Sequence, residues 1–181
     1  MNTHELVNIR KRIMFVKADD VYFIAYNLLI SLYELKATST SRPFRDYRKL
    51  SFLIDFVADP RLTAILQDSK RFGIPPNSED RHELSVAYSR GASRMPHSMR
   101  VICALESRGI LSIERGNQSE GFDLWLHVEK LPGGFLADEL YEVERSNIST
   151  LRAMWPQLRI VRLDTMLQNF FGVNGVEAWH A

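Results

Sequence analysis

The stretch SRMPHSMRVICALESRGILSIERGNQSEGFDLWLHVE, residues 93–129, decides the expected fold of this chain. Pro96 suits the first turn of a helix, and Gly109 is typical of a position where a helix stops. Between them, apolar residues recur at helical spacing, at Met99, Ile102, Cys103 and Leu105. Two extended segments follow, 110–114 and 122–128, joined by the polar loop RGNQSEG. The stretch therefore predicts a helix, a glycine stop and a β-hairpin.

This order of elements is typical of the reading helix and wing of a winged-helix domain. We therefore expect an α+β fold, mostly α-helical, in which a winged-helix domain carries a β-hairpin wing and additional C-terminal helices follow it. The expected organisation is an N-terminal arm over residues 1–17, the winged-helix domain over 18–130 and a C-terminal helical extension over 131–181.

Apolar residues at spacings of three and four predict further helices on both sides of this stretch. The expected spans are 20–36, capped by Asp19 or Asp20, then 47–60, 61–69 and 81–94 before it, and 138–155 and 164–172 after it. Gly91 is expected to interrupt the helix over 81–94. The first helix is apolar around nearly its whole circumference, so it must be covered on more than one side. It is either central to the domain or half of a subunit interface.

Composition and charge argue against a free-standing nucleic-acid binder. The chain has 181 residues, 45% hydrophobic and 25% charged, an ordinary globular composition. Its 23 lysines and arginines nearly balance its 22 aspartates and glutamates, so the net charge is +1. Proteins that bind DNA alone usually have a clear basic excess. Any contact with DNA should therefore be local or shared with a partner protein.

Three features predict a cytoplasmic protein without a membrane segment. Cys103 is the only cysteine, which excludes an internal disulfide and fits a reducing compartment. Its apolar neighbours predict that it is buried as a small hydrophobic residue. The N-terminus lacks the apolar core of a signal peptide. The longest apolar stretch, VYFIAYNLLISLY from Val21, is too short and too interrupted to cross a bilayer.

The sequence offers little that supports catalysis. Its histidines lack metal-ligand spacing, and its glycine-rich stretches lack the lysine and serine of a phosphate-binding loop. Asp55 and Asp59 lie four residues apart on an expected helix. Carboxylates at that spacing are usually solvated or paired with a basic residue, here Arg48 or Arg61. We therefore expect no enzyme activity, no catalytic residue, no metal ligand and no cofactor.

Arginines around the central helix and the base of the hairpin are the candidate DNA-binding residues. They are Arg90, Arg94, Arg100, Arg108 and Arg115. Arginine at a reading helix can bind phosphates beside a groove. Arg90 and Arg94 are the preferred pair because a spacing of four would place them on one helix face. The alternative is a solvated surface partly neutralised by Glu106 and Glu114.

Four aromatic residues are the candidate partner-binding residues: Trp125, Trp155, Phe170 and Phe171. In the second strand, Phe122, Leu124, Leu126 and Val128 alternate and are expected to face the core. Trp125 would then lie on the opposite, polar face, where another part of the chain or a partner must cover it. Trp155 can also pack internally. Phe170 and Phe171 end the last helix with apolar surface that a partner could bury.

Three stretches resemble the middle components of bacterial three-component ABC-ATPase systems. They are DYRKLSFLIDFVADP, AYSRGASRMPHSMRVICALESRGILSI and DLWLHV, within residues 18–130. The group includes the small accessory subunit of Lamassu-type defence systems. The resemblance implies a winged-helix subunit, without an active site of its own, that pairs with an SMC-like ATPase having ABC-type heads and a coiled coil. A third subunit carries the effector, often a nuclease. The long C-terminal helices depart from a minimal middle component.

Two functions therefore remain open. The first is a non-enzymatic accessory subunit of a DNA-sensing bacterial defence complex, whose partners are an SMC-like coiled-coil ATPase, an effector nuclease and duplex DNA bound through the complex. The second is a winged-helix transcriptional regulator that binds operator DNA as a dimer. A regulator should have a basic reading helix, whereas the central helix here is mixed in charge and contains Glu106. That mixture, with the near-neutral chain, favours the first function.

Overall fold

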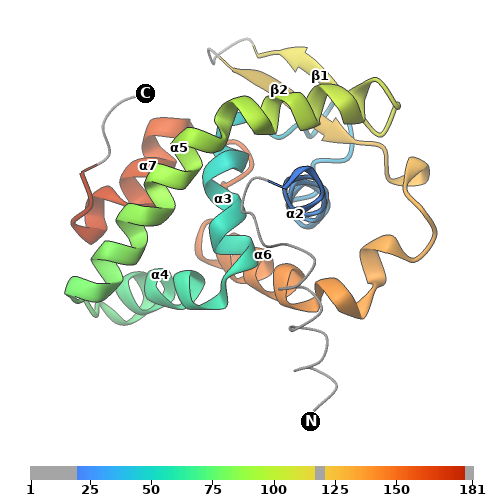
Figure 1. Ribbon diagram of the computed structural model, residues 1–181. Coiled ribbons are helices and arrows are strands. Elements are labelled where there is room, and N and C mark those ends of the chain that lie inside the picture. The colour runs from blue at the N-terminus through green and yellow to red at the C-terminus, as the bar shows by residue number, and fades with distance from the viewer. Residues whose placement is uncertain (1–19, 117–120, 178–181) are drawn as a thin grey trace.

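A computed structural model describes residues 20–116 and 121–177 (Figure 1). The α-helices of this part are α2 (Val21–Glu34), α3 (Arg48–Ala58), α4 (Pro60–Phe72), α5 (Ser78–Glu106), α6 (Glu142–Met154) and α7 (Leu163–Phe170). Strands β1 (Leu111–Arg115) and β2 (Phe122–Leu126) form a two-stranded sheet. Short 3-10 helices are η1 (Val128–Lys130), η2 (Phe135–Ala137), η3 (Glu139–Tyr141) and η4 (Gly172–Asn174). The protein is thus mostly helical and of the α+β class, as predicted. The expected arm over residues 1–17 lies outside the described residues.

Helix α2 lies at the centre of the fold. Asp20 caps its first turn, because the Asp20 carboxylate accepts hydrogen bonds from the backbone amides of Tyr22, at 2.7 Å, and Phe23. Figure 1 shows α2 end-on, with α5 above it and α6 below it, and it also contacts α3 and β2. Ile24, Leu28 and Leu32 are fully buried. The prediction that this helix is covered on more than one side is confirmed, and the cover comes from its own chain.

Helix α3 is buried along almost its whole length and packs between α5 and α6. The residues directly before α3 set where this helix begins. Asp46 has a left-handed backbone conformation, with φ 62°. The backbone amide of Asp46 donates to the carboxylate of Asp123 on β2 at 3.0 Å. This hydrogen bond holds the start of α3 against the sheet.

Helix α5 is continuous from Ser78 to Glu106, so the expected interruption at Gly91 and the expected start at Pro96 are both wrong. A capping box between Asn77 and Asp80 starts the helix instead. Gly91 lies inside because α5 crosses α3 there: a Cβ added at Gly91 would lie 2.4 Å from the Phe52 ring. Pro96 lacks the amide hydrogen that an interior turn uses, but the helix runs through it.

The predicted glycine stop of α5 is confirmed. Gly109 has φ 67°, a conformation that costs glycine little. The amide of Ile110 donates to the carbonyl of Leu105 at 3.0 Å, which is the six-residue bond that closes a helix end of this kind. The chain then turns directly into β1.

The hairpin is antiparallel, as predicted, and its register pairs Leu111 with Leu126 and Arg115 with Phe122. Leu124 and Leu126 are fully buried, as expected. Phe122 is 36% exposed, so its expected inward position is wrong. The reason is its place at the open end of the hairpin, where its ring lies beside that of Tyr47 at a centroid distance of 6.3 Å. Val128 lies in η1 rather than in the strand and is half-buried.

The segment 44–47 runs along the free edge of β2. Phe44 and Leu124 exchange two backbone hydrogen bonds, at 2.8 and 3.0 Å, and the amide of Tyr47 donates to the carbonyl of Phe122 at 2.9 Å. Because β1 pairs with the other edge of β2, this segment covers the edge that would otherwise be open. The loop between α2 and α3 is therefore part of the sheet region.

The C-terminal residues share one core with the rest of the chain, rather than forming an extension that packs by itself. Ile148 and Leu151 of α6 and Phe170 of α7 are fully buried within the same hydrophobic cluster as α2, α3 and α5. Helix α6 contacts α2, α3 and α4. The expected boundary at residue 130 separates no two cores among the described residues. None of the described helices combines the length and the apolar composition needed to cross a membrane.

Candidate nucleic-acid interface

Four of the five predicted arginines lie on the surface. Arg90 and Arg100 are exposed on α5, Arg108 is exposed at its C-terminal turn, and Arg115 is exposed at the end of β1. The last three belong to one continuous run of chain from helix to hairpin. Glu106 and Glu114 are also exposed in this run, so the surface is mixed in charge. It can contact phosphates at a few positions, but it is not a strongly basic face.

Arg94 is fully buried, so its predicted role in DNA binding is wrong. One guanidinium nitrogen lies 2.9 Å from a carboxylate oxygen of Asp55, and the other donates to the Ser51 carbonyl at 3.0 Å. Arg90 and Arg94 lie only about 40° apart around the axis of α5. The boundary between the exposed and the buried surface of the helix falls between them, and periodicity alone did not show its place. Arg94 joins α5 to α3 inside the molecule.

The two aspartates that resembled a catalytic pair have structural roles. Burial raises the pKa of the Asp55 carboxyl, while the positive charge and hydrogen bonds of Arg94 oppose that rise. Asp59 caps α4, accepting from the amide of Arg61 at 2.9 Å. The expected pairing of these aspartates with the side chains of Arg48 or Arg61 is wrong. Those side chains pair with Asp46, at 2.8 Å, and Glu79, at 2.7 Å.

Cys103 is exposed, contrary to the prediction. Its neighbours Ile102 and Leu105 are buried against the core. Cys103 follows Ile102 by one residue, a rotation of about 100° around the helix axis, which places it outside the buried stripe. The apolar neighbours in sequence therefore belong to a different face.

The predicted partner-binding residues differ in how far they are buried. Phe170 and Phe171 are fully buried, which makes their predicted partner role wrong, because their rings pack on Phe56 at centroid distances of 5.1 and 5.6 Å. Trp155 is half-buried, and its ring lies tilted against that of Phe170 at a centroid distance of 4.7 Å. Trp125 is half-buried on the outer face of the sheet, opposite Ser112. Only Trp125 keeps a surface position away from this aromatic cluster.

Exposed apolar side chains occur at the other end of the molecule, where sequence reasoning had not placed them. Phe72 and Ile74, at the end of α4, are 61% and 56% exposed, and Val173 of η4 is 64% exposed. A hydrogen bond of 2.5 Å between Ser69 and Asn174 joins α4 to η4. The three side chains therefore lie on one end of the fold. No periodic signal marks them, since they stand at helix ends and in a turn.

A second group of arginines, which the sequence analysis missed, lies on two loops. Arg42 and Arg45 precede α3, and Arg159 lies between α6 and α7. The amide of Arg45 donates to the Arg159 carbonyl at 3.0 Å, and the Arg159 guanidinium donates to the Pro43 carbonyl at 2.8 Å. We call these three residues the loop arginines. Their separation in sequence left no local pattern that could have revealed them.

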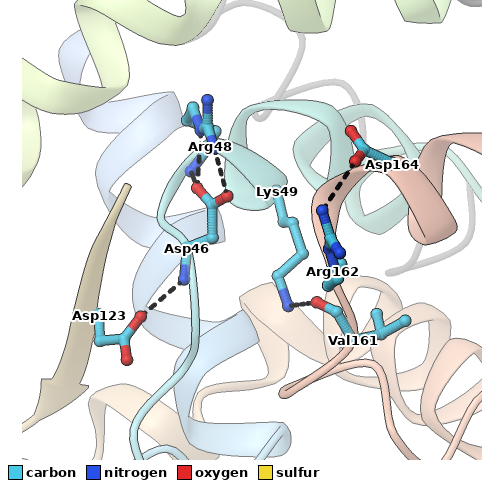
Figure 2. A network of polar contacts seen from close by, with 7 residues as sticks. All are labelled: Asp46, Arg48, Lys49, Asp123, Val161, Arg162 and Asp164. Carbon is cyan, nitrogen blue, oxygen red and sulfur yellow. Dashed lines mark hydrogen bonds and ion pairs between the residues drawn. The ribbon is translucent and has the colours of Figure 1, made fainter. Parts of the chain in front are cut away.

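Lys49 is fully buried, and its side chain runs from the start of α3 to the backbone at Val161 (Figure 2). Its Nζ donates to the carbonyls of Leu158, Arg159 and Val161, at 2.9, 3.1 and 2.8 Å. The same nitrogen lies 4.4 Å from the centre of the Phe44 ring. Burial lowers the pKa of Lys49 to about 7, although the negative charges of Asp46 and Asp123 oppose that shift. Lys49 thus fixes the 158–161 loop against the start of α3.

Within residues 20–116 and 121–177, no group of three or more histidine, cysteine, aspartate or glutamate side chains is arranged to hold a metal ion. Comparison of the chain with protein-family models, with curated proteins and with solved structures found no match.

Proposed function

We propose that this chain is a non-enzymatic accessory subunit that binds an SMC-like, ABC-type ATPase and helps assemble a DNA-sensing bacterial defence complex with an effector nuclease. In this proposal the fold is a winged helix, with the C-terminal half of α5 as the reading helix and β1–β2 as the wing. The observation that carries it is the run of exposed arginines Arg100, Arg108 and Arg115 along that helix and hairpin. The run falls largely within the stretches whose sequence resembles the accessory subunits.

The absence of an enzymatic role is supported by what the acidic residues do. Asp55 is held by Arg94 in a buried ion pair of 2.9 Å, and Asp59 caps α4. A carboxylate occupied in this way is not positioned to activate water or to bind a catalytic metal ion. The chain would then contribute binding surfaces, and the ATPase and the nuclease would contribute the chemistry.

The ATPase-facing surface in this proposal is the exposed apolar end formed by Phe72, Ile74 and Val173. Buried aromatic and aliphatic side chains supply much of the energy of protein interfaces. Phe170, Phe171 and most of α2 lie inside the core, and these three are among the large apolar side chains that remain exposed. They replace the C-terminal phenylalanines as the candidate contacts.

The test is co-purification of the tagged full-length chain from its native host, followed by mass spectrometry. We expect a coiled-coil ATPase to be recovered in stoichiometric amount. If Phe72 and Val173 are anchor residues of the interface, the double variant Phe72→Ser/Val173→Ser should reduce that recovery by about tenfold or more, since truncating an anchor typically costs more than about 1 kcal/mol. Circular dichroism should show an unchanged fold, because both side chains are already exposed.

The outcome that would contradict the proposal is recovery of the chain as a free dimer with no ATPase. Tight, sequence-specific binding of that dimer to one operator would support the transcriptional regulator instead. Full ATPase recovery by the double variant would leave the accessory role in place and exclude the apolar end as the contact surface.

A further inference from the structure

The outer face of the hairpin carries a serine, a histidine and a glutamate that contact one another in that order. Ser112 Oγ and His127 Nε2 are hydrogen-bonded at 2.8 Å. His127 Nδ1 lies 3.6 Å from a carboxylate oxygen of Glu129. Ser112 belongs to β1, His127 directly follows β2, and Glu129 lies in η1. The hairpin therefore brings together a hydroxyl, an imidazole and a carboxylate in the order that nucleophilic catalysis uses.

Backbone pairing fixes these side chains relative to one another. The amide of His127 donates to the carbonyl of Ile110 at 2.9 Å, which continues the pairing of the two strands beyond β2. Ser112 stands directly opposite Trp125 in the register. Because side chains alternate along a strand, Ser112, Trp125 and His127 share the face that points away from the buried Leu124. All three are half-buried, so a small molecule in solution can reach them.

The carboxylate of Glu129 decides which nitrogen of His127 carries the proton. A neutral imidazole has one protonated and one unprotonated nitrogen, and the partner of each nitrogen selects the tautomer. Glu129 favours the proton on Nδ1, so Nε2 accepts the hydrogen bond from the Ser112 hydroxyl. In this tautomer His127 can take the hydroxyl proton as the oxygen attacks. The side chain of Glu129 is 70% exposed, so solvent weakens its effect.

Other exposed serines lack such a partner. The hydroxyls of Ser89, Ser93 and Ser107 each donate to a carbonyl oxygen of α5 at 3.0 Å. A backbone carbonyl is far too weak a base to take the hydroxyl proton, so these hydroxyls stay weak nucleophiles. Ser112 differs from them because its hydrogen-bond partner is a base.

The surroundings of Ser112 favour an uncharged acyl group over a phosphoryl group. The Trp125 ring lies across the strand pair from Ser112 and offers apolar surface to an acyl chain. A phosphoryl donor is anionic, and the Glu129 carboxylate on the other side of His127 repels it. An activated acyl donor, such as a thioester, carries its own good leaving group and needs only a nucleophile and a base.

We propose that Ser112 is a site of covalent acyl modification, with His127 as the base and an acyl thioester as the donor. Ser112 Oγ attacks the thioester carbonyl carbon while its proton passes to His127 Nε2. The carbon–sulfur bond then breaks, and the proton passes from His127 to the leaving thiolate. One hydroxyl and one thioester thus give one ester and one thiol, without oxidation or reduction. The modification goes beyond the proposed function and does not depend on it.

The experiment incubates the purified full-length chain with the octanoyl or the acetyl thioester of N-acetylcysteamine. The chain carries Cys103→Ala, because the exposed thiol of Cys103 would itself attack a thioester. Mass spectrometry of the intact chain measures the rate of acylation, and peptide fragmentation locates the acyl group. We expect an ester at Ser112, formed faster from the octanoyl donor than from the acetyl donor.

Variants in the same background assign the roles. Ser112→Ala should abolish the ester at this position, and Ser107→Ala, the matched control, should leave it unchanged. His127→Gln keeps a hydrogen-bonding side chain without a base and should slow acylation at least about tenfold. Glu129→Gln should slow it only about two- to fivefold, since exposed charge pairs are weak. Trp125→Ala should remove the preference for the octanoyl donor. Circular dichroism checks that each variant is folded.

Three outcomes would overturn the inference. They are acyl groups on lysines alone, an unchanged rate of Ser112 acylation in His127→Gln, and phosphorylation of Ser112 by acetyl phosphate where neither thioester reacts. Recovery of the ATPase is a separate measurement on the unmodified chain, so the accessory role and the acylation site can fail independently.

Discussion

At the scale of single residues, the buried pair of Arg94 and Asp55 is the most demanding feature of this protein. Removing two charges from water costs several kilocalories per mole for each ion, and only good geometry offsets that cost. Here the carboxylate meets the guanidinium at 2.9 Å and the Ser51 carbonyl accepts a further bond at 3.0 Å. The pair holds α3 against α5, and removing either partner leaves the other as an uncompensated charge.

We therefore predict that Asp55→Ala lowers the free energy of unfolding by about 3–5 kcal/mol, because Arg94 is left charged and unpaired inside the core. The double variant Asp55→Leu/Arg94→Met should recover most of that loss, since it removes both charges. Urea unfolding followed by circular dichroism measures both values. A loss below about 1 kcal/mol in the single variant, the range of surface pairs, would contradict the structure.

We predict that Lys49 makes the free energy of unfolding depend on pH. Its pKa is lowered by burial from 10.5 to about 7. Between these values the unfolded state binds more protons than the folded state, so the free energy of unfolding rises with pH. The contribution is complete above the unfolded pKa and is lost as the pH falls through the folded one. The slope has an upper limit of about 1.4 kcal/mol per pH unit.

The measurement compares urea unfolding of the wild type and Lys49→Met at pH 7, 8 and 9. The wild type should gain stability relative to the variant over this window, because the variant cannot titrate there. A parallel rise in both proteins would assign the pH dependence to other groups. The variant also loses the hydrogen bonds from the Lys49 Nζ to the 158–161 loop, so it should be less stable than the wild type at all three pH values.

At the scale of elements, α5 carries two residues that normally weaken a helix, yet it continues through both. Gly91 is where the α5 backbone approaches α3, and Pro96 follows five residues later. Tertiary packing outweighs local propensity here, since α5 contacts α2, α3, α4 and β1. The helix is therefore stabilised along its length by its neighbours.

Gly91→Ala should destabilise the protein by about 1–3 kcal/mol, although alanine is the better helix former by about 1 kcal/mol. The added Cβ would lie 2.4 Å from the Phe52 ring and 3.0 Å from its backbone Cα, so α3 itself would have to move. Ser93→Ala, at an exposed position of the same helix, is the matched control and should be neutral or slightly stabilising. Equal or greater stability of Gly91→Ala in urea unfolding would show that the helices do not meet there.

At the scale of the whole molecule, aromatic rings unite the C-terminal third with the centre. Phe171 lies within 6.2 Å of Phe52 and 5.3 Å of Tyr88, and Phe170 lies 5.1 Å from Phe56. The first two contacts join Phe171, directly after α7, to α3 and α5. Residues 163–171 are thus part of the same core as α3 and α5.

Phe170→Ser/Phe171→Ser should unfold the protein rather than release a partner from a folded one. Each buried phenylalanine removed from a core costs about 3–5 kcal/mol, and a domain of this size has only about 5–15 kcal/mol of stability. Circular dichroism and limited proteolysis measure the loss of structure. The exposed variant Phe72→Ser is the control and should keep the fold. A folded double variant would place α7 outside the core.

The sequence by itself determined the local elements. The helix that begins near residue 20, Gly109 as a helix stop, and the inward positions of Leu124 and Leu126 follow from residue chemistry and from periods of two and 3.6 residues. These signals act within a few residues, so neighbouring side chains are enough to reveal them. The α+β class and the helix-to-hairpin order follow from the same signals.

The tertiary structure alone decided which faces meet. A periodic pattern shows that a helix has an apolar face, but not whether its own chain or a partner covers that face. For this reason the sequence could not show that Phe170 and Phe171 fill the core, that Arg94 turns inward to Asp55, or that Arg159 joins Arg42 and Arg45. Burial and charge clustering at these positions depend on contacts between segments far apart along the chain, and only folding brings those segments together.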